Sequence, residues 1–353
     1  MQQIEIGGNG YRMSINLSII ATSRNDDHGG DTLKRMTLFV NGLLTQTRKY
    51  HAEIELIIVE WNPPTGKPLL HEVLPTPGKD DLLIIRYIIV PENIHRKFRH
   101  GDTIPLFQMI AKNVGIRRAT GKFVLCTNID LLFSNDLFEK MIDENLDPMK
   151  VYRANRCDIP SSINENWSFD QQLKFAEENI ISTAGKNSHY THLVKAQEWA
   201  YRYHSVAKTL QWIAVIRSKI VEDPIELQLR LLDTDACGDF TMMSKDAWID
   251  IQGYPELDLY SIHVDSMGLI AAAALQYDQV IFPQKACTYH IHHNTGWASM
   301  SPVDKIRFWS DRPGIGWDAV VEAGKYLLEN NVRYDVNPPE WGFSDMDLQE
   351  IKQ

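Results

Sequence analysis

The feature that most constrains the fold is an alternation of apolar runs and helical patterns over the first part of the chain. The runs at 15–22, 54–59, 82–90 and 123–126 are short and apolar, as is typical of buried strands. After the first and third runs, apolar residues recur at helical spacing. Since strands that alternate with helices form right-handed βαβ units, the sequence predicts an α/β fold. We expect a mostly parallel central sheet with helices on both faces.

Polar side chains mark the ends of three of these runs. Thr22, Arg24 and Asn25 lie at the end of the first run, Glu60 follows the second, and Asp130 follows the fourth. The carboxyl ends of parallel strands meet at one edge of a sheet, where open α/β sheets bind nucleotides. The sequence therefore predicts a nucleotide site at this edge. An alternative for Asp130 is a capping role at the next helix.

The overall composition narrows the class of protein. The 353 residues suffice for one large α/β domain with insertions, or for two domains. The net charge is −10 and no basic block occurs, so general nucleic-acid binding is not expected. The four cysteines form no CxxC pair, which indicates reduced thiols and a cytoplasmic protein. Neither a signal peptide nor an apolar run of membrane-spanning length occurs, which leaves peripheral association at the inner face of a membrane open.

A second informative block lies at residues 237–256. A short strand is expected at 240–243, followed by Ser244 as the N-cap of a short helix and by Gly253 as its stop. Asp265 then opens an apolar helix. A further strand leads into a histidine cluster at residues 290, 292 and 293. This part of the chain therefore supplies further candidate carboxylates and imidazoles for the site at the edge of the sheet.

Taken together, these motifs resemble an inverting glycosyltransferase of the GT-A fold, in the broad family-2 or galactosyltransferase-like group. The resemblance covers roughly residues 15–135 and 236–297. It rests on a Thr-x-Asn-acidic turn, an acidic strand end that holds the nucleoside, a helix motif, a metal motif and three later turns. In this chain these are Thr22-Ser23-Arg24-Asn25-Asp26, Glu60, Ala111 to Gly121 with Asn113 and Arg117, Asn128-Ile129-Asp130, Gly238-Asp239-Phe240, Gly253-Tyr254-Pro255-Glu256 and Asp265.

We expect the chain to divide into four segments. Residues 1–150 would form the nucleotide-sugar-binding half, and 236–300 the acceptor and catalytic half. Residues 151–235 are expected to be a mainly helical insertion, because a long amphipathic helix is predicted at 198–220. Residues 301–353 would carry a C-terminal helix and a tail.

Two departures from the family pattern bear on the metal and the base. The first position of the metal motif is Asn128 and not aspartate, and an amide oxygen binds a cation without adding charge. The acidic pair that usually precedes the base helix is His263-Val264-Asp265, with one carboxylate. Asn128 is therefore expected to lower the metal affinity or to make the metal dispensable.

The resemblance implies a divalent cation, Mn²⁺ or Mg²⁺, held by Asp130. Mn²⁺ also accepts imidazole ligands, which assigns a role to the histidine cluster. His290 and His292 would point to one face of an extended segment and His293 to the other, so His290 and then His292 are the candidate ligands. The alternative is that several of these histidines are ordinary surface residues.

Transfer also requires a general base that accepts the proton of the acceptor hydroxyl. Asp265 is the first candidate and Asp239 the second, or Asp239 holds the acceptor sugar. The alternative for Asp265 is a first-turn residue stabilised by the helix dipole. Arg117 would reach phosphate or form a solvated salt bridge.

We therefore expect a transferase that moves a sugar from a UDP- or GDP-linked donor to a glycan or lipid-linked acceptor. Two other functions remain open at this stage. A nucleotidyltransferase also binds a nucleotide beside a metal, but usually carries a basic, Gly-rich loop where this chain has Asp26 and Asp27. A non-catalytic carbohydrate-binding protein of the same fold would account for Asn128.

Overall fold

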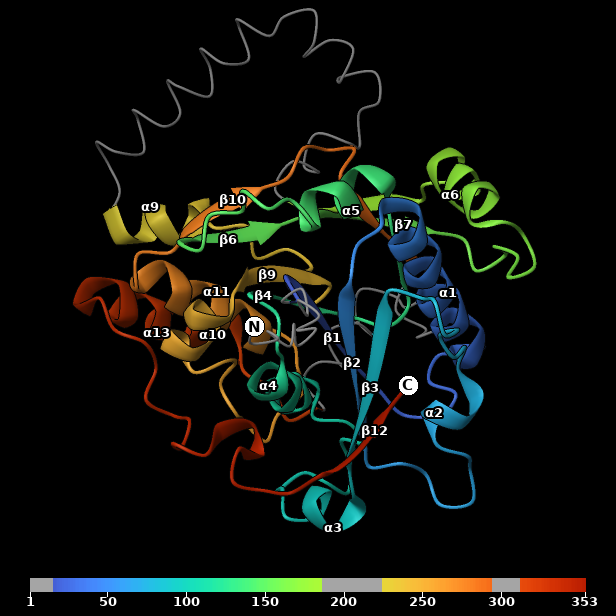
Figure 1. Cartoon of the computed structure of the whole chain (residues 1–353). Coiled ribbons are helices and arrows are strands. Elements are labelled where there is room, and N and C mark those ends of the chain that lie inside the picture. The colour runs from blue at the N-terminus through green and yellow to red at the C-terminus, as the bar shows by residue number, and fades with distance from the viewer. Residues whose placement is uncertain (1–14, 186–223, 294–311) are drawn as a thin grey trace, which may run out of the picture.

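An eight-stranded mixed sheet forms the centre of the structure, in the strand order β10-β6-β9-β4-β1-β2-β3-β12 (Figure 1). The computed structural model describes residues 15–185, 224–293 and 312–353. Strand β1 pairs in parallel with β2 and β4, and β2 with β3, so the predicted parallel block is confirmed. The strands are β1 Leu17–Ser23, β2 Ile54–Trp61, β3 Leu83–Val90, β4 Phe123–Thr127, β6 Lys150–Arg153, β9 Phe240–Ser244, β10 Asp278–Ile281 and β12 Gln349–Lys352.

Strands β9 and β12 run against their neighbours in this sheet. Strand β9 is antiparallel to both β4 and β6, and β12 is antiparallel to β3. Arg86 on β3 fixes β12 in place, because its guanidinium forms ion pairs with Glu350 at 2.7 Å and with Glu55 at 2.6 Å. Strand β12 therefore covers the outer edge of a parallel block built from residues 17–127.

Helices cover both faces of the sheet, as predicted (Figure 1). Successive residues of β1 face opposite sides, since Ile20 belongs to one apolar cluster and Ile19 to the other. On the Ile20 side lie α3 Glu92–His95, α4 Gln108–Arg118, α9 Pro224–Leu231, α10 Lys245–Ile251, α11 Val264–Ala274, α13 Trp317–Asn330 and the 3₁₀ turn η2 Trp341–Phe343. On the Ile19 side lie α1 Thr32–Tyr50, α2 Leu70–Val73 and α5 Asn135–Met141.

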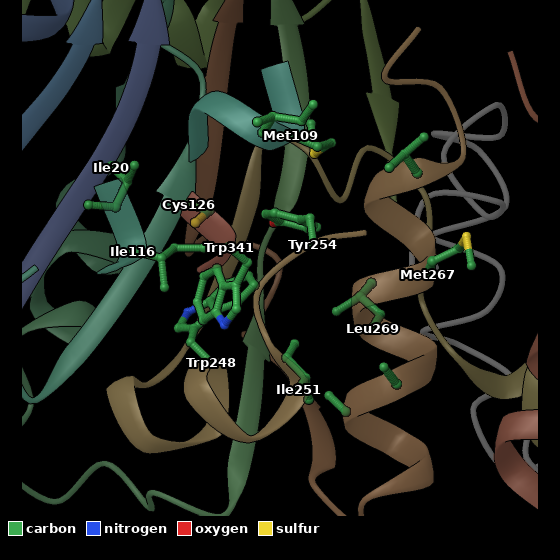
Figure 2. Close-up of a cluster of buried hydrophobic side chains, with 14 of the residues drawn as sticks. Ile20, Met109, Ile116, Cys126, Trp248, Ile251, Tyr254, Met267, Leu269 and Trp341 are labelled. Atoms are coloured by element: carbon green, nitrogen blue, oxygen red, sulfur yellow. The ribbon is translucent and has the colours of Figure 1, made fainter. Parts of the chain in front are cut away.

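Trp248 and Trp341 are two of the three buried tryptophans on the Ile20 side of the core (Figure 2). Trp248 is fully buried, and its indole N–H donates to the carbonyl of Val124 at 3.0 Å. Burial of a large side chain of this kind contributes roughly 1.5–3 kcal/mol. Trp341 lies beside it, and Tyr254 packs against Trp248 with ring centroids 5.0 Å apart. The 240–256 block therefore packs against the parallel strands through aromatic side chains.

A second, four-stranded sheet stands beside the carboxyl ends of the central strands. Its order is β5-β11-β7-β8, with β5 at Leu131–Phe133, β7 at Asn155–Ile159, β8 at Ser182–Ala184 and β11 at Cys287–Ile291. Helix α6, Phe169–Glu178, packs on it through Phe169 and Leu173. In this sheet His290 stands opposite both Leu131 and Asp158. The sheet thereby brings side chains far apart in the sequence to the end of β4.

Several predicted local features are confirmed. Ser244 caps α10, because its hydroxyl accepts the N–H of Ala247 at 3.2 Å, and Gly253 ends that helix at φ 69°. Leu33 is 40 % exposed, since it lies on the outer side of the first turn of α1. Asn113, on α4, is fully buried under the turn at Tyr254.

The segment 151–235 differs from expectation where the structure describes it. Residues 151–185 carry β6, β7 and β8 besides α6, and β6 is a strand of the central sheet. Its strands are short and polar on one face, so their sequence has no clear apolar period. The helix predicted at 198–220 lies outside the described residues, and the four-segment division remains a prediction. Among the described helices, none combines the length and apolar composition needed to cross a bilayer.

Candidate functional site

A cavity of about 280 Å³ opens at the carboxyl ends of β1 and β4. Four residues predicted to bind the donor line it: Thr22, Arg24, Asn128 and Asp130. The position agrees with the rule that open α/β sheets bind ligands beyond their strand ends. The remaining lining residues are Ser23, Asp26, His28, Thr32, Arg35, Met36, Ile104, Pro105, Leu106, Gln108, Ile129, Tyr260, Ser261 and His293.

One wall of this cavity carries Asp130 and His293, and His290 lies beside Asp130 without lining the cavity. One potential ligand atom each from Asp130, His290 and His293 lies within 4.8 Å of the others. Asp130 Oδ2 is 3.7 Å from His290 Nε2 and 3.3 Å from His293 Nε2. The predicted pairing of Asp130 with His290 is thus present in the geometry. We call these three residues the Asp-His-His cluster.

His292, the second histidine predicted as a ligand, is not part of the cluster, and His293 stands in its place. The reason is that β11 ends at Ile291, so the alternation of an extended strand does not continue to residue 293. The backbone N–H of His292 donates to the carbonyl of Ile159 at 2.8 Å. The chain then brings the His293 ring against Gly29, close to the end of β1.

The orientation of His290 is set by a second carboxylate. His290 Nδ1 lies 2.8 Å from Asp158 Oδ1, which leaves Nε2 directed at Asp130. Asp158 is itself held by the hydroxyl of Ser182 at 2.7 Å and by Arg156 at 3.0 Å. Burial lowers the pKa of His290, but the two carboxylates outweigh burial and raise it. A carboxylate behind a histidine is the arrangement that orients imidazole ligands toward metals.

Arg35 supplies a fixed positive charge next to Asp130. Its Nε lies 3.8 Å from Asp130 Oδ2, and its guanidinium donates to the carbonyls of His28 and Gly30. Burial alone would raise the pKa of Asp130, but His290, His293 and Arg35 together hold that pKa well below its usual value. Asp130 is therefore ionised at neutral pH, as a metal ligand must be.

The cluster fits a divalent cation by the chemistry of its donors. Asp130 Oδ1 and His293 Nδ1 are buried polar atoms without a hydrogen-bond partner among the described residues. Asp130 Oδ1 is therefore available to a further ligand, whereas His293 Nδ1 faces Gly29. One carboxylate with two imidazoles suits Mn²⁺ and related transition ions better than Mg²⁺, which prefers oxygen ligands and water.

Asn128 lines the cavity but uses its amide within the protein. Its Oδ1 accepts from Gln108 Nε2 at 2.6 Å and from Lys112 Nζ at 3.4 Å, and its Nδ2 donates to Asp239 Oδ1. Lys112 is fully buried and also donates to the carbonyl of Gly238 at 2.6 Å. Asn128 therefore links α4 to the start of β9.

Both oxygens of Asp239 are hydrogen-bonded. One accepts from Asn128, and the other accepts from Arg156 Nη1 at 2.9 Å. Asp239 is only 4 % exposed and lines neither of the cavities beside it. Asp239 was one of two carboxylates predicted as the base. Its carboxylate has no free access to a substrate hydroxyl.

Asp265 lies at the start of α11 and lines a second cavity of about 540 Å³. Its Oδ1 accepts the N–H of Ser266 at 2.9 Å. Burial raises the pKa of Asp265, although Cys237 and Lys112 act against this shift. The second cavity shares Tyr260 and Ser261 with the first, so the two cavities adjoin. Asp265 thus lines the cavity next to the Asp-His-His cluster.

Two further predicted residues lie near the first cavity without lining it. Asn25 is buried and donates to the carbonyl of Pro68 at 3.0 Å. Glu60 is fully buried and accepts the N–H of Leu70 at 2.9 Å. Burial raises the pKa of Glu60 to about 7. Both side chains hold the loop after β2 in this structure.

Asn113 and Arg117 lie away from both cavities. Asn113 accepts the N–H of Tyr254 at 2.7 Å and donates to its carbonyl at 2.8 Å, so it fixes the turn after α10. The Arg117 guanidinium lies 4.7 Å from the centre of the Trp341 ring, a cation–π contact. Neither residue therefore lies where it would contact a donor in the first cavity.

Sequence reasoning missed five residues that shape the site: His28, Arg35, Arg156, Asp158 and His293. Gly29 and Gly30 carried a signal, because two adjacent glycines after a strand allow another chain segment to approach closely. Asp158 and Arg156 lie on a short polar strand whose pairing with β11 is visible only in three dimensions.

The chain is similar to several solved structures. No protein-family model and no curated protein sequence matches the chain. A solved structure of the mannosyltransferase PcManGT from Pyrobaculum calidifontis, in complex with GDP-Man and Mn²⁺, is 12 % identical over 90 % of this chain and 70 % of its own, with a TM-score of 0.37. S. aureus TarS in complex with UDP-GlcNAc is 14 % identical over 90 % of this chain and 72 % of its own, with a TM-score of 0.40.

The catalytic domain of Drosophila β1,4-galactosyltransferase 7, in complex with xylobiose, is a further similar structure. It is 10 % identical over 88 % of this chain and 79 % of its own, with a TM-score of 0.35. The assignment of residues to chemistry rests on the geometry described above.

Proposed function

We propose that this protein is a glycosyltransferase that moves a sugar from a nucleotide-sugar donor to a glycan acceptor with inversion at the anomeric carbon. The observation that carries the proposal is that Asp130 and His293 of the Asp-His-His cluster line one cavity and Asp265 lines the adjoining one. The first cavity, at the strand ends, would hold the donor diphosphate. The second would hold the acceptor beside a carboxylate.

Asp130, His290 and His293 would hold a divalent cation in the donor cavity. When bound, such an ion neutralises the negative charge that develops on the departing diphosphate. Asp158 orients His290, and Arg35 adds a fixed positive charge beside Asp130. A phosphate-rich donor is therefore met by cationic groups on this wall of the cavity.

Asp265 is proposed as the general base. The oxygen of the acceptor hydroxyl forms a bond to the anomeric carbon while the bond from that carbon to the diphosphate oxygen breaks. The hydroxyl proton passes to the Asp265 carboxylate, and the bonding electron pair leaves with the diphosphate. A pKa raised by burial strengthens Asp265 as a proton acceptor. Attack from the side opposite the diphosphate inverts the anomeric carbon.

A thermal-shift titration tests the donor assignment. UDP, GDP and ADP are each added with and without Mn²⁺, and the unfolding midpoint is followed. A nucleotide at a hundred times its Kd stabilises the native state by about 2.7 kcal/mol, so the expected result is a clear rise for one base that requires Mn²⁺. A rise without metal would remove the cation from the proposal, and no rise with any nucleotide would overturn it.

The variant Asp265→Asn tests the base assignment. Loss of a general base typically lowers kcat by about 10²–10⁴-fold. We therefore expect sugar transfer to fall by that factor while the nucleotide-induced thermal shift stays as in the wild type. Wild-type turnover by this variant would contradict the assignment and redirect attention to Asp239.

A further inference from the structure

Lys112 is a fully buried lysine that lies close to both cavities and lines neither of them. It belongs to α4, and its Nζ donates to the carbonyl of Gly238 at 2.6 Å and to Asn128 Oδ1 at 3.4 Å. Lysine side chains are almost never fully buried unless a negative charge balances them. The carboxylate that balances Lys112 therefore indicates what this residue does.

Two carboxylates attract the Lys112 ammonium. Burial lowers the pKa of Lys112, whereas Asp265 and Asp239 act in the opposite direction. Asp239 is already balanced, because it forms an ion pair with Arg156 at 2.9 Å and accepts a hydrogen bond from Asn128. Asp265 is thus the carboxylate left to balance Lys112.

Gly238 separates the ammonium of Lys112 from the carboxylate of Asp265. A Cβ atom at Gly238 would lie 3.0 Å from Asp265 Oδ2 and 3.9 Å from Lys112 Nζ. The two charged groups therefore lie around one point, which is open because Gly238 has no side chain. The carbonyl of the same glycine holds the ammonium in place. A glycine at this position lets the two charges act on each other with no side chain between them.

The surroundings of Asp265 disfavour its charged form. Burial raises the pKa of Asp265, and Cys237 and Lys112 act against this shift. A donor diphosphate in the adjoining cavity would add negative charge and disfavour the carboxylate further. Because a carboxylate must be ionised to accept the proton of a hydroxyl, a base at this position needs a fixed positive charge beside it.

The other cations near Asp265 are engaged elsewhere. Arg153 is fully buried and also acts on Asp265, less strongly than Lys112 does, but its guanidinium donates to backbone carbonyls of the 233–237 loop. The Arg156 guanidinium is bound by two other carboxylates. The remaining titratable groups around this cavity are Asp235, Cys237 and His263, with Arg312 beside Tyr260.

We propose that Lys112 is a positioning residue for the general base: its ammonium, behind Gly238, balances the Asp265 carboxylate and holds it as an anion at the wall of the second cavity. Lys112 keeps its own proton throughout, and the proton of the acceptor hydroxyl passes to Asp265 alone. The proposal rests on the proposed function and adds to it a residue that touches no substrate.

Difference infrared spectroscopy on the full chain tests the proposal without any substrate. The spectrum of each protein, minus that of the same protein carrying Asp265→Asn, isolates the Asp265 carboxyl group, and its ionisation is followed against pH. Lys112→Met removes the ammonium, so the midpoint of this ionisation should rise by about 1–3 pH units. An unchanged or lower midpoint would overturn the proposal.

Gly238→Ala tests the same contact with the ammonium still present. The added methyl group would press on Asp265 Oδ2 and lie between it and Lys112, so the carboxylate must move away from the ammonium. The midpoint should again rise, by less than in Lys112→Met. This variant decides the question if Lys112→Met does not fold, and an unchanged midpoint would then count against the proposal.

Lys245→Met is the matched control. Lys245 also donates to a backbone carbonyl, that of Ala119, but at the opposite end of β4. Its loss should leave the ionisation of Asp265 as in the wild type. A rise equal to that of Lys112→Met would show that the ammonium beside Gly238 has no special effect.

The pH dependence of sugar transfer supplies the functional readout, with the nucleotide sugar whose base gives the thermal shift as donor. Lys112→Met should be roughly tenfold slower on the acidic limb and approach the wild-type rate at high pH, where Asp265 ionises without help. An equal loss at every pH would mean that Lys112 does not act through the base.

The two sets of measurements separate this proposal from the proposed function. Wild-type transfer by Asp265→Asn would overturn the proposed function, and with it the base that Lys112 serves. Loss of transfer by Asp265→Asn, together with an infrared midpoint that Lys112→Met does not move, would overturn the role of Lys112 alone.

Discussion

At the scale of single residues, His293 is the side chain on which the candidate metal site most depends. Its Nε2 is 3.3 Å from Asp130, whereas His292, one residue earlier, is outside the cluster. His293→Ala should weaken Mn²⁺ binding about 10–100-fold, and His292→Ala should leave it nearly unchanged. Titration calorimetry of both variants with Mn²⁺ makes the comparison. A larger loss with His292→Ala would return the assignment to the residue expected from strand alternation.

Glu60 leads to a prediction about pH. Its native pKa is raised to about 7 by burial, whereas an unfolded glutamate titrates near 4.5. Between these values the native state binds the extra proton, so native stability falls as the pH rises through this window and the cost is complete above about pH 7. The full difference is about 3 kcal/mol.

The variant Glu60→Gln removes this titration. Its free energy of unfolding relative to the wild type should therefore rise by about 3 kcal/mol between pH 4.5 and pH 8. Urea unfolding at the two pH values measures the change, and the pH 4.5 comparison contains any effect of the amide itself. The same difference at both pH values would show that Glu60 is not buried as a neutral acid.

Residue roles were predictable from the sequence where a side chain ends a strand. Thr22, Arg24 and Asp130 line the donor cavity because the end of a parallel strand fixes their position. Asn113 was misplaced, since a helical pattern does not reveal which later turn covers a polar residue. Asp158 was missed because its importance comes from pairing with His290 across strands more than a hundred residues apart in the sequence.

At the scale of elements, the loop between β1 and α1 depends on two glycines with different surroundings. Gly29 and Gly30 have φ values of 72° and 75°, which non-glycine residues adopt only with strain. A Cβ atom at Gly29 would lie 2.5 Å from His293 Nδ1, whereas one at Gly30 meets nothing within 4 Å. The loop therefore lets the His293 ring approach the end of β1.

This difference supplies a matched pair of variants. Gly29→Ala and Gly30→Ala should each lower stability by about 1 kcal/mol through backbone strain. Only Gly29→Ala should also displace His293 and weaken Mn²⁺ binding. Thermal unfolding and Mn²⁺ titration of both variants separate the two effects. Equal Mn²⁺ affinity in the two variants would mean that Gly29 is not needed to place His293.

Element by element, the parallel strands β1 to β4 were predictable, whereas β6 and β12 of the central sheet and the strands β7 and β8 of the second sheet were not. Buried parallel strands read as continuous apolar runs, so β1 to β4 are visible in the sequence. Strands β7 and β8 are short and contain polar residues, and they are ordered by pairing with β11 and by packing on α6. A local sequence pattern does not reveal which distant segments such a strand pairs with.

At the scale of the whole molecule, β12 closes the outer edge of the parallel block. Deletion of residues 349–353 would remove the antiparallel pairing with β3 and expose its apolar edge. We expect concentration-dependent association of the truncated protein, measured by light scattering, because open strand edges pair with other chains. Glu350→Gln is the control: Glu350 is partly exposed, so loss of its ion pair should cost at most about 1 kcal/mol and cause no association.

The pairing of β12 with β3 also determines how long the edge of β3 stays unpaired during synthesis. Arg86 and Glu350, which join the two strands, are separated by 264 positions. A ribosome that adds roughly 5–20 residues per second needs on the order of 13–50 s to synthesise that interval. During synthesis, β1, β2 and β3 leave the ribosome early, but the edge of β3 stays unpaired until nearly the whole chain has been made. The nascent protein therefore carries an open β-edge for most of its synthesis, the period in which binding by a chaperone would have the greatest effect on its yield.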